Sequence, residues 1–130
     1  MAYRLLVCGG RTFNERGLSW ELSRWLANHP DLEIITGYNL DDERFQGADE
    51  LAFKWAEACG VPVFPFAAPW RKRGRAAGPI RNQRMLDLGK PHAVLAAPGG
   101  IGTADMCRRA VKAGLPVTEL ASSPNSGRVS

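Results

Sequence analysis

The strongest constraint on the fold is a regular alternation of short apolar runs with amphipathic segments. The apolar runs lie at 3–8, 32–36, 61–66, 93–97 and 117–120. Between them, apolar side chains recur at helical spacing over 15–28, 48–58, 80–88 and 103–113. Short buried strands that alternate with helices form a parallel sheet with both faces covered. The sequence therefore predicts an α/β, Rossmann-like, doubly wound sheet of about five strands with helices on both faces.

Length and composition fit one domain. The 130 residues are 45% hydrophobic and 23% charged, close to the average of globular proteins. We expect one domain over residues 1–120 and a flexible tail over 121–130. No run of about 18 apolar residues and no signal-peptide core is present, so we expect a cytoplasmic protein that does not enter membranes. The three cysteines and two histidines are scattered, which predicts neither a metal site nor a disulfide framework.

Charge is distributed unevenly along the chain. The net charge is +4, but residues 1–60 carry an excess of four acidic groups and residues 61–130 an excess of eight basic ones. Six of the basic groups fall close together, at Arg71, Lys72, Arg73, Arg75, Arg81 and Arg84. Such a cluster favours an anionic partner, such as a phosphate, a nucleotide or nucleic acid, although a solvated loop has the same composition.

Glycine-rich turns follow the first and the fourth predicted strand. In a doubly wound sheet, ligands bind beyond the carboxyl ends of the strands, where the strand order reverses. The first turn is Gly9-Gly10-Arg11-Thr12, in which glycines allow a tight turn and Arg11 can bind phosphate. The second turn contains Pro98, Gly99, Gly100, Gly102 and Thr103. Three glycines in four residues before a helix predict an anion cradle with positive φ angles and exposed N–H groups, capped by Thr103.

Two polar segments complete the predicted site. Gly78-Pro79 precedes the short helix predicted at 80–88, and Arg81 and Asn82 then lie near its positive end. Asp105 is expected in the first turn of the last helix, where it either takes part in chemistry or compensates the helix dipole. The turns contain neither a Walker lysine nor a GxGxxG pattern, so no NAD-type cofactor is expected.

Four motifs in this order resemble the SLOG superfamily, which includes Lonely Guy phosphoribohydrolases and DNA-processing Smf/DprA proteins. They are GGRT at 9–12, GAD at 47–49, GRAAGPIRNQRM at 74–85 and PGGIGTADM at 98–106. Within it, the chain is most similar to the small bacterial and phage proteins of the YpsA/YspA-related branch. The resemblance implies a Rossmann-like fold, a nucleotide-derived ligand of the ADP-ribose type, and a homodimer. It adds Gly47 and Asp49 to the expected ligand-binding residues.

The chain departs from the Lonely Guy pattern at two places. Those enzymes carry PGGxGTxxE, and here Met106 stands at the position of the glutamate. An oxocarbenium-like transition state needs a nearby carboxylate, which leaves Arg81 with Asp105 or Asp49 as the expected catalytic groups. The second departure is an insertion at 38–46. Its carboxylates are expected to cover the ligand from the rim, to bind a cation beside a phosphate, or to form a solvated loop.

Three functions follow as hypotheses. The first is a binding module for a nucleotide or nucleotide-derived ligand, acting as a sensor, carrier or sequestering protein. The second is an enzyme, a nucleoside 5′-monophosphate phosphoribohydrolase. The third is a single-stranded DNA-binding protein, in which Trp70 beside Arg71 would stack on bases. The intact cradle and the missing glutamate favour the first.

Overall fold

The computed structural model describes residues 2–14, 16–38 and 47–120, and of residues 70 and 71 it describes the backbone alone. The strands are β1 (Tyr3–Cys8), β2 (Leu32–Thr36), β3 (Val63–Pro65), β4 (Ala93–Ala96) and β5 (Val117–Glu119). The helices are α1 (Gly17–Asn28), α2 (Ala48–Cys59), α3 (Trp70–Arg73), α4 (Ala77–Gly89) and α5 (Ile101–Lys112). A turn of 3-10 helix, Gly74–Ala76, joins α3 to α4.

The five strands form one sheet in the order β3-β2-β1-β4-β5. Every neighbouring pair is parallel, and central β1 pairs on both sides, with Leu5 opposite Ile34 of β2 and Ala93 of β4. The chain moves outward from β1 to β3, then returns to β4 beside β1. The turns after β1 and β4 therefore lead to opposite faces of the sheet, and a crevice opens between them at the carboxyl edge.

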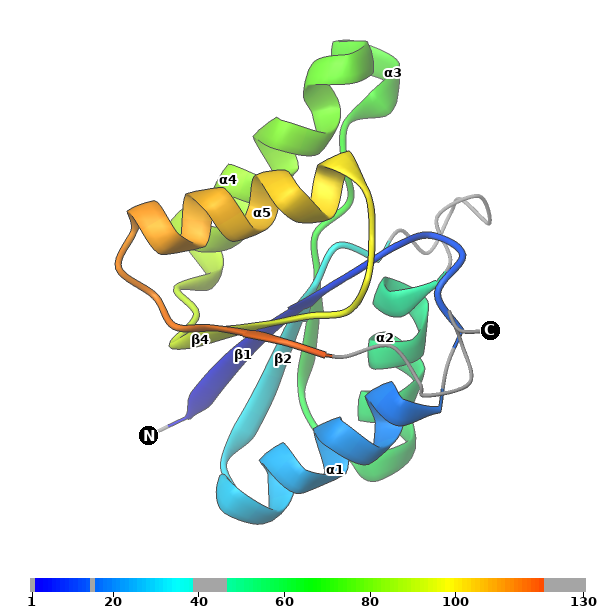
Figure 1. Cartoon of the computed structure of the whole chain (residues 1–130), viewed down its shortest axis with the longest axis vertical. Helices are drawn as coiled ribbons and strands as arrows, with labels where there is room; N and C mark the ends of the chain where they lie inside the picture. Colours follow the sequence, from blue (N-terminus) through cyan, green and yellow to red (C-terminus); the bar gives the residue numbers. More distant parts are fainter. Residues whose placement is uncertain (1, 15, 39–46, 121–130) are drawn as a thin grey trace, which may run out of the picture.

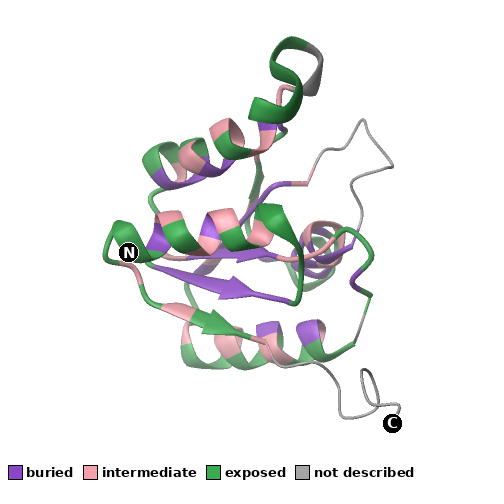
Figure 2. Ribbon diagram, turned by 45° about the horizontal axis from the view of Figure 1, so that its top comes forward, coloured by how far each residue is buried: buried purple, intermediate pink, exposed green. Residues whose placement is uncertain are grey.

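Helices cover both faces of the sheet, α1 and α2 one face and α4 and α5 the other (Figure 1). Side chains of β1 alternate between two apolar clusters, because successive residues of a strand point to opposite faces. Leu5 and Val7 pack toward α1 and α2, whereas Leu6 and Cys8 pack toward α4 and α5. Figure 2 shows the buried central strands between helices that are exposed on their outer sides, whereas the edge strands β3 and β5 are more exposed. The predicted doubly wound α/β fold is confirmed.

Two helix starts differ from the prediction. The segment between the strand predicted at 61–66 and the helix predicted at 80–88 contains α3 and the 3-10 turn, and α4 begins at Ala77. Pro79 is tolerated there because the first turn of a helix does not use its N–H groups. Helix α5 begins at Ile101, so Gly102 and Thr103 are helical and Gly100 is the N-cap residue.

Two predicted segments, the insertion from residue 39 to 46 and the tail at 121–130, lie outside the described residues. Their roles as a rim and as a flexible tail stay predictions. No helix in the described part of the chain combines the length and the apolar character that crossing a bilayer requires.

Candidate functional site

A cavity of about 460 Å³ lies at the carboxyl edge of the sheet, in the crevice beside β1 and β4. It is lined from four directions: the end of β1 and the turn after it, the turn after β2 with the start of α2, the first half of α4, and the start of α5. The lining residues are Cys8, Gly9, Gly10, Arg11, Gly37, Asp49, Gly78, Arg81, Asn82, Met85, Gly100, Ile101, Gly102 and Thr103. Ligand sites in proteins commonly measure roughly 300–1,000 Å³, so the cavity is large enough for a small ligand.

Gly10 ties three turns together at the edge of this cavity. Its N–H donates to the Pro98 carbonyl at 2.9 Å, and its own carbonyl accepts from the N–H groups of Phe13 at 3.2 Å and Ala48 at 3.1 Å. A Cβ at position 10 would lie 3.0 Å from the Pro98 oxygen and 3.2 Å from the Gly99 Cα. The glycines here let the turns after β1 and β4 touch, which fixes the shape of the crevice.

The N-terminus of α5 faces the cavity without a side-chain cap. The Ala104 N–H donates to the Gly100 carbonyl at 3.0 Å, and no side chain caps the helix at Gly100. In a helix the N–H groups of the preceding positions, here Ile101, Gly102 and Thr103, have no intrahelical partner. Uncapped N–H groups and the positive end of the helix dipole together bind anions.

Arg81 of α4 reaches across to the turn after β2. Its Nη1 donates to the Gly37 carbonyl at 2.8 Å and to the Phe66 carbonyl at 3.4 Å, and its Nε donates to Asn82 Oδ1 at 3.1 Å. Among the described residues, no hydrogen bond to protein uses its Nη2. Burial lowers the pKa of Arg81, opposed by the nearby Asp49 carboxylate, yet a guanidinium stays charged near neutral pH. The Arg81 guanidinium is therefore a positive charge held in place at the cavity, and its Nη2 can donate hydrogen bonds to a ligand.

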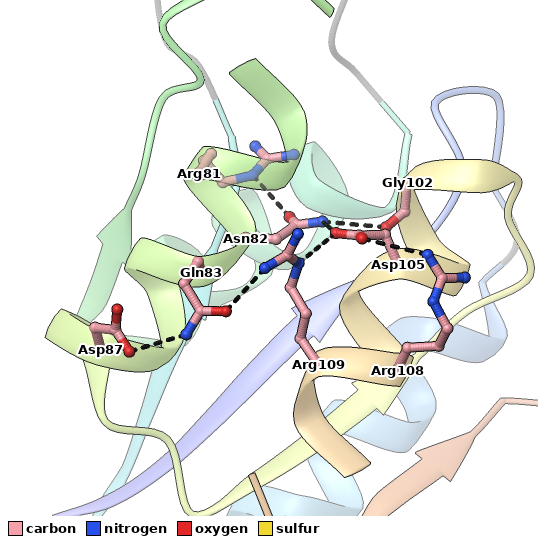
Figure 3. A network of polar contacts seen from close by, with 8 residues as sticks. All are labelled: Arg81, Asn82, Gln83, Asp87, Gly102, Asp105, Arg108 and Arg109. Carbon is pink, nitrogen blue, oxygen red and sulfur yellow. Dashed lines mark hydrogen bonds and ion pairs between the residues drawn. The ribbon is translucent and has the colours of Figure 1, made fainter. Parts of the chain in front are cut away.

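A polar network behind Arg81 joins α4 to α5 (Figure 3). Asn82 is 3% exposed, and its Nδ2 donates to the Gly102 carbonyl at 3.2 Å and to Asp105 Oδ2 at 3.0 Å. Asp105 also accepts from Arg109 Nε at 2.8 Å and Arg108 Nη2 at 3.3 Å. Since both ends of the Asn82 amide are occupied by protein, this residue orients Arg81 and the start of α5.

Asp49, in the first turn of α2, is the carboxylate that faces the cavity among the described residues. Burial raises its pKa to about 6, against the lowering effects of Arg81, the Thr36 hydroxyl and the Gly37 N–H. Although these groups stabilise the carboxylate, desolvation outweighs them. A carboxyl group with a pKa close to neutral can accept or donate a proton under physiological conditions, as binding and catalytic carboxyl groups do.

A second depression of about 450 Å³ lies on the α1 side of the Gly10–Pro98 contact. It shares Gly10, Arg11 and Gly100 with the cavity and is otherwise lined by Thr12, Phe13, Asn14, Pro98 and Gly99. The two hollows are thus adjacent compartments that meet at the ends of β1 and β4. The ridge between them is made of backbone and Arg11.

The structure brings most of the expected site residues to this cavity and separates the others. Of the residues expected from the sequence, the cavity is lined by Gly9, Gly10, Arg11, Asp49, Arg81, Asn82, Gly100, Gly102 and Thr103. Thr12, Pro98 and Gly99 line the second depression. Gly47, at φ +82°, lies against the backbone of Gly10 and Arg11 instead of lining either hollow.

Asp105 lies apart from the cavity. It is held by Asn82, Arg108 and Arg109, and it lines a shallow depression on the outer side of α5. Partial burial raises the pKa of Asp105, but the hydrogen bonds from Arg109 and Asn82 outweigh this and hold it below the ordinary value. It lies in the second turn of α5, because that helix begins at Ile101. The expected first-turn position is therefore wrong.

Two details of the expected cradle also differ. Gly99, Gly100 and Gly102 do not have positive φ angles; in the described part of the chain the glycines that do are Gly47, Gly60, Gly74 and Gly114. Thr103 does not cap α5, since it lies inside the helix. The described residues contain no group of histidine, cysteine or carboxylate side chains arranged for a metal ion.

Sequence reasoning missed five residues that line the cavity: Cys8, Gly37, Gly78, Met85 and Ile101. Gly37 could have been found as the residue that ends the second strand, and Gly78 as part of the run before Arg81. A Cβ on Gly37 would collide with the Arg81 guanidinium, so glycine admits this arginine to the cavity. Cys8 and Met85 carried no signal, because both have the apolar pattern of core residues.

Comparison with known proteins agrees with this architecture. The model of a family described as "YspA, cpYpsA-related SLOG family" matches residues 3–72. The Gene 61 protein of Mycobacterium phage D29 is 32% identical, over 93% of this chain and 98% of that protein. A solved UDP-N-acetylglucosamine 2-epimerase from Rickettsia bellii matches with a TM-score of 0.50 and 16% identity, which shows a shared fold. The match covers 92% of this chain and 31% of the epimerase chain.

Proposed function

This chain belongs to the YspA, cpYpsA-related SLOG family, and from that premise we propose that its cavity binds a nucleotide or nucleotide-derived ligand. The family and the Rossmann-like sheet support a nucleotide-related role in general. The specific proposal is a binding module, acting as a sensor, carrier or sequestering protein, whose ligand carries at least one phosphate.

One observation carries the proposal. The uncapped N-terminus of α5, the backbone of Gly10 and two arginines, Arg11 and Arg81, meet around one cavity at the switch point of the sheet. Helix N–H groups and guanidinium groups are the donors that proteins use for phosphate. Asp49, which lines the same cavity near Arg81, can accept hydrogen bonds from hydroxyl groups, which suits a ribose beside the phosphate.

The second depression extends the proposal to ligands with two nucleoside-like ends. Because it meets the cavity at Gly10, Arg11 and Gly100, a pyrophosphate over this ridge would leave one end in each hollow. ADP-ribose has that shape, whereas AMP would fill the cavity alone. We therefore expect ADP-ribose to bind more tightly than AMP.

A phosphoribohydrolase is the second candidate, and the position of Asp49 favours it. Hydrolysis of an N-glycosidic bond needs a carboxyl group near the sugar and a cation for the phosphate. Asp49 beside Arg81 supplies this pair, whereas Asp105 is held outside the cavity. Met106, at the position of the Lonely Guy glutamate, is fully buried in the apolar cluster under α5.

A thermal-shift screen with AMP, ADP-ribose, NAD and short single-stranded DNA tests these proposals, followed by chromatography of the nucleotides for free base. Stabilisation by an intact nucleotide supports the binding module. Release of base that Asp49→Asn abolishes supports the hydrolase. No shift with any nucleotide argues against the proposed site.

Single-stranded DNA and a second copy of the chain remain proposed partners. Helices α1 and α2 together carry a net charge of −2, helices α4 and α5 together carry +3, and the two pairs cover opposite faces of the sheet. A polyanion would therefore approach the face that α4 and α5 cover. A shift with DNA alone that disappears in salt would favour the DNA-binding hypothesis. Sedimentation of the full chain tests the expected homodimer.

A further inference from the structure

Asp105 lies outside the cavity, yet the side chain of Asn82 connects it to Arg81 (Figure 3). The Arg81 Nε donates to Asn82 Oδ1 at 3.1 Å, and Asn82 Nδ2 donates to Asp105 Oδ2 at 3.0 Å. Asn82 is 3% exposed and the Asp105 side chain 14%, so water competes little for either bond. A continuous chain of hydrogen bonds therefore runs from a carboxylate of α5 to the guanidinium of α4 that faces the cavity.

The chemistry of the three side chains fixes the direction of this hydrogen-bond chain. An arginine only donates and a carboxylate only accepts, so Asn82 has to turn its oxygen toward Arg81 and its nitrogen toward Asp105. If the amide were turned over, its oxygen would face the Asp105 carboxylate and the Gly102 carbonyl, and its nitrogen would face the Arg81 Nε. Each of these contacts would join two donors or two acceptors. Asp105 thus helps to hold the Asn82 amide in the orientation that accepts from Arg81.

Asp105 is itself held as an ionised carboxylate by two arginines of its own helix. Arg109 Nε donates to Asp105 Oδ2 at 2.8 Å, and Arg108 Nη2 donates to Oδ1 at 3.3 Å. Arg109 is tied in turn to α4, because its Nη1 donates to Gln83 Oε1 at 2.9 Å. The carboxylate therefore has a fixed place between the two helices, and it keeps the charge that makes it an acceptor.

We propose that Asp105 is a positioning residue for the ligand phosphate, because through Asn82 it holds the Arg81 guanidinium toward the cavity. This role rests on the proposed function, in which Arg81 binds the phosphate. The other side of Arg81 is held by the Gly37 carbonyl at 2.8 Å and the Phe66 carbonyl at 3.4 Å. A guanidinium that is fixed from both sides loses less freedom when a ligand binds, which raises affinity.

The first measurement needs no ligand. In the ¹⁵N-labelled full chain, the NMR signal of the Arg81 Nε–H is the one that Arg81→Ala removes. Asp105→Ala should shift this signal and speed its exchange with water about fivefold, because the Asn82 amide loses an acceptor. Asp105→Asn keeps an oxygen for Asn82 and should restore most of the protection.

Asp87→Ala is the matched control for this measurement. Asp87 is an exposed aspartate of α4 that accepts from Gln83 Nε2 at 3.0 Å, at the far end of the same network. Its loss should leave the Arg81 signal unchanged.

The second measurement compares AMP with adenosine, which lacks the phosphate, by isothermal titration. Asp105→Ala should weaken the binding of AMP about fivefold and leave that of adenosine unchanged, because the phosphate is the group that Arg81 contacts. Added to Arg81→Ala, the same substitution should weaken AMP no further, since both act on one interaction. A role in the fold alone would weaken both ligands.

An unchanged Arg81 signal in Asp105→Ala would overturn the proposal, and so would an equal loss of AMP and adenosine binding. A wild type that binds no nucleotide, while its Arg81 signal responds to Asp105 as expected, would refute the proposed function and still support the positioning of Arg81. If Asp105→Ala does not fold, Asp105→Glu takes its place. It keeps the charge but displaces the oxygens by one methylene group, and it should shift the same signal.

Discussion

After β1 the chain continues as Gly9-Gly10, and after β4 as Gly99-Gly100-Ile101-Gly102, so two glycine-rich turns face each other. A Cβ on Gly9 would lie 2.6 Å from the Ala48 Cβ and 2.7 Å from the Ala97 Cβ. On Gly100 or Gly102 it would meet no protein atom within 4 Å, although both residues line the cavity. Glycine is therefore required by packing in the first turn, whereas at these two positions it leaves room for a ligand.

We expect the largest effect on stability from a methyl group added at Gly9, in the tightly packed turn after β1. Gly9→Ala should lower the free energy of unfolding by about 2–3 kcal/mol, because two strands and α2 would have to move apart. Gly17→Ala is the matched control, since a Cβ there meets nothing within 4 Å. Chemical denaturation measures both. Equal stability of the two variants would contradict the packing role of Gly9.

Substitution of Arg81 tests whether the cavity binds the ligand. Arg81→Ala should weaken nucleotide binding by about 1.5–3 kcal/mol, the cost of losing charge-assisted hydrogen bonds. Arg84→Ala, on the exposed side of the same helix, should bind as the wild type. Isothermal titration with whichever nucleotide stabilises the protein measures the two affinities. If both variants bound equally well, the ligand would lie elsewhere.

We expect the buried, ionised carboxylate of Asp49 to lower the stability of the folded protein. Its pKa is raised to about 6 in the fold, above the ordinary value of 3.8, so the folded state retains a proton that the unfolded chain releases. Stability therefore falls as the pH rises from about 4 to 6. Asp49→Asn should gain about 1–2 kcal/mol above pH 6 and nothing below pH 4.

Unfolding of the wild type and Asp49→Asn across pH 3.5–7.5 measures this difference. The variant should at the same time bind the nucleotide more weakly, since it has lost the carboxylate that faces the ribose. A variant that is destabilised at every pH would show that Asp49 supports the fold.

We expect the smallest effect on stability from a substitution at Gly102, after β4, where an added Cβ has open space around it. The same substitution should clearly weaken ligand binding. Gly102→Ala should change the free energy of unfolding by less than about 0.5 kcal/mol, because the added methyl group meets no protein atom and alanine favours helix. The methyl group would occupy ligand space, so affinity should fall about tenfold. A large loss of stability, or unchanged affinity, would remove the distinction between the two turns.

The sheet and the edge that carries the site could be predicted from the sequence. Short apolar runs and helical spacing are local patterns, and parallel strands must place their carboxyl ends together. The turns at Gly9–Thr12 and Pro98–Thr103 were therefore expected at the same edge of the sheet, and Arg81 followed from its place near the start of a helix. That the two turns meet depends on the strand order, which places β4 beside β1. None of these conclusions needs the packing of a particular side chain.

The tertiary structure decided which side chains reach the cavity. Asp105 was expected to line the cavity. Because α5 begins at Ile101, Asp105 lies in the second turn of the helix, where its carboxylate accepts from Asn82 and Arg109. Asp49 acquires its raised pKa from burial, because desolvation outweighs the lowering effect of the nearby Arg81. The sequence by itself determined the order of elements and the turns at the ligand edge, since these depend on neighbours along the chain. Helix phase, burial and contacts between distant residues depend on packing, and those only the tertiary structure decided.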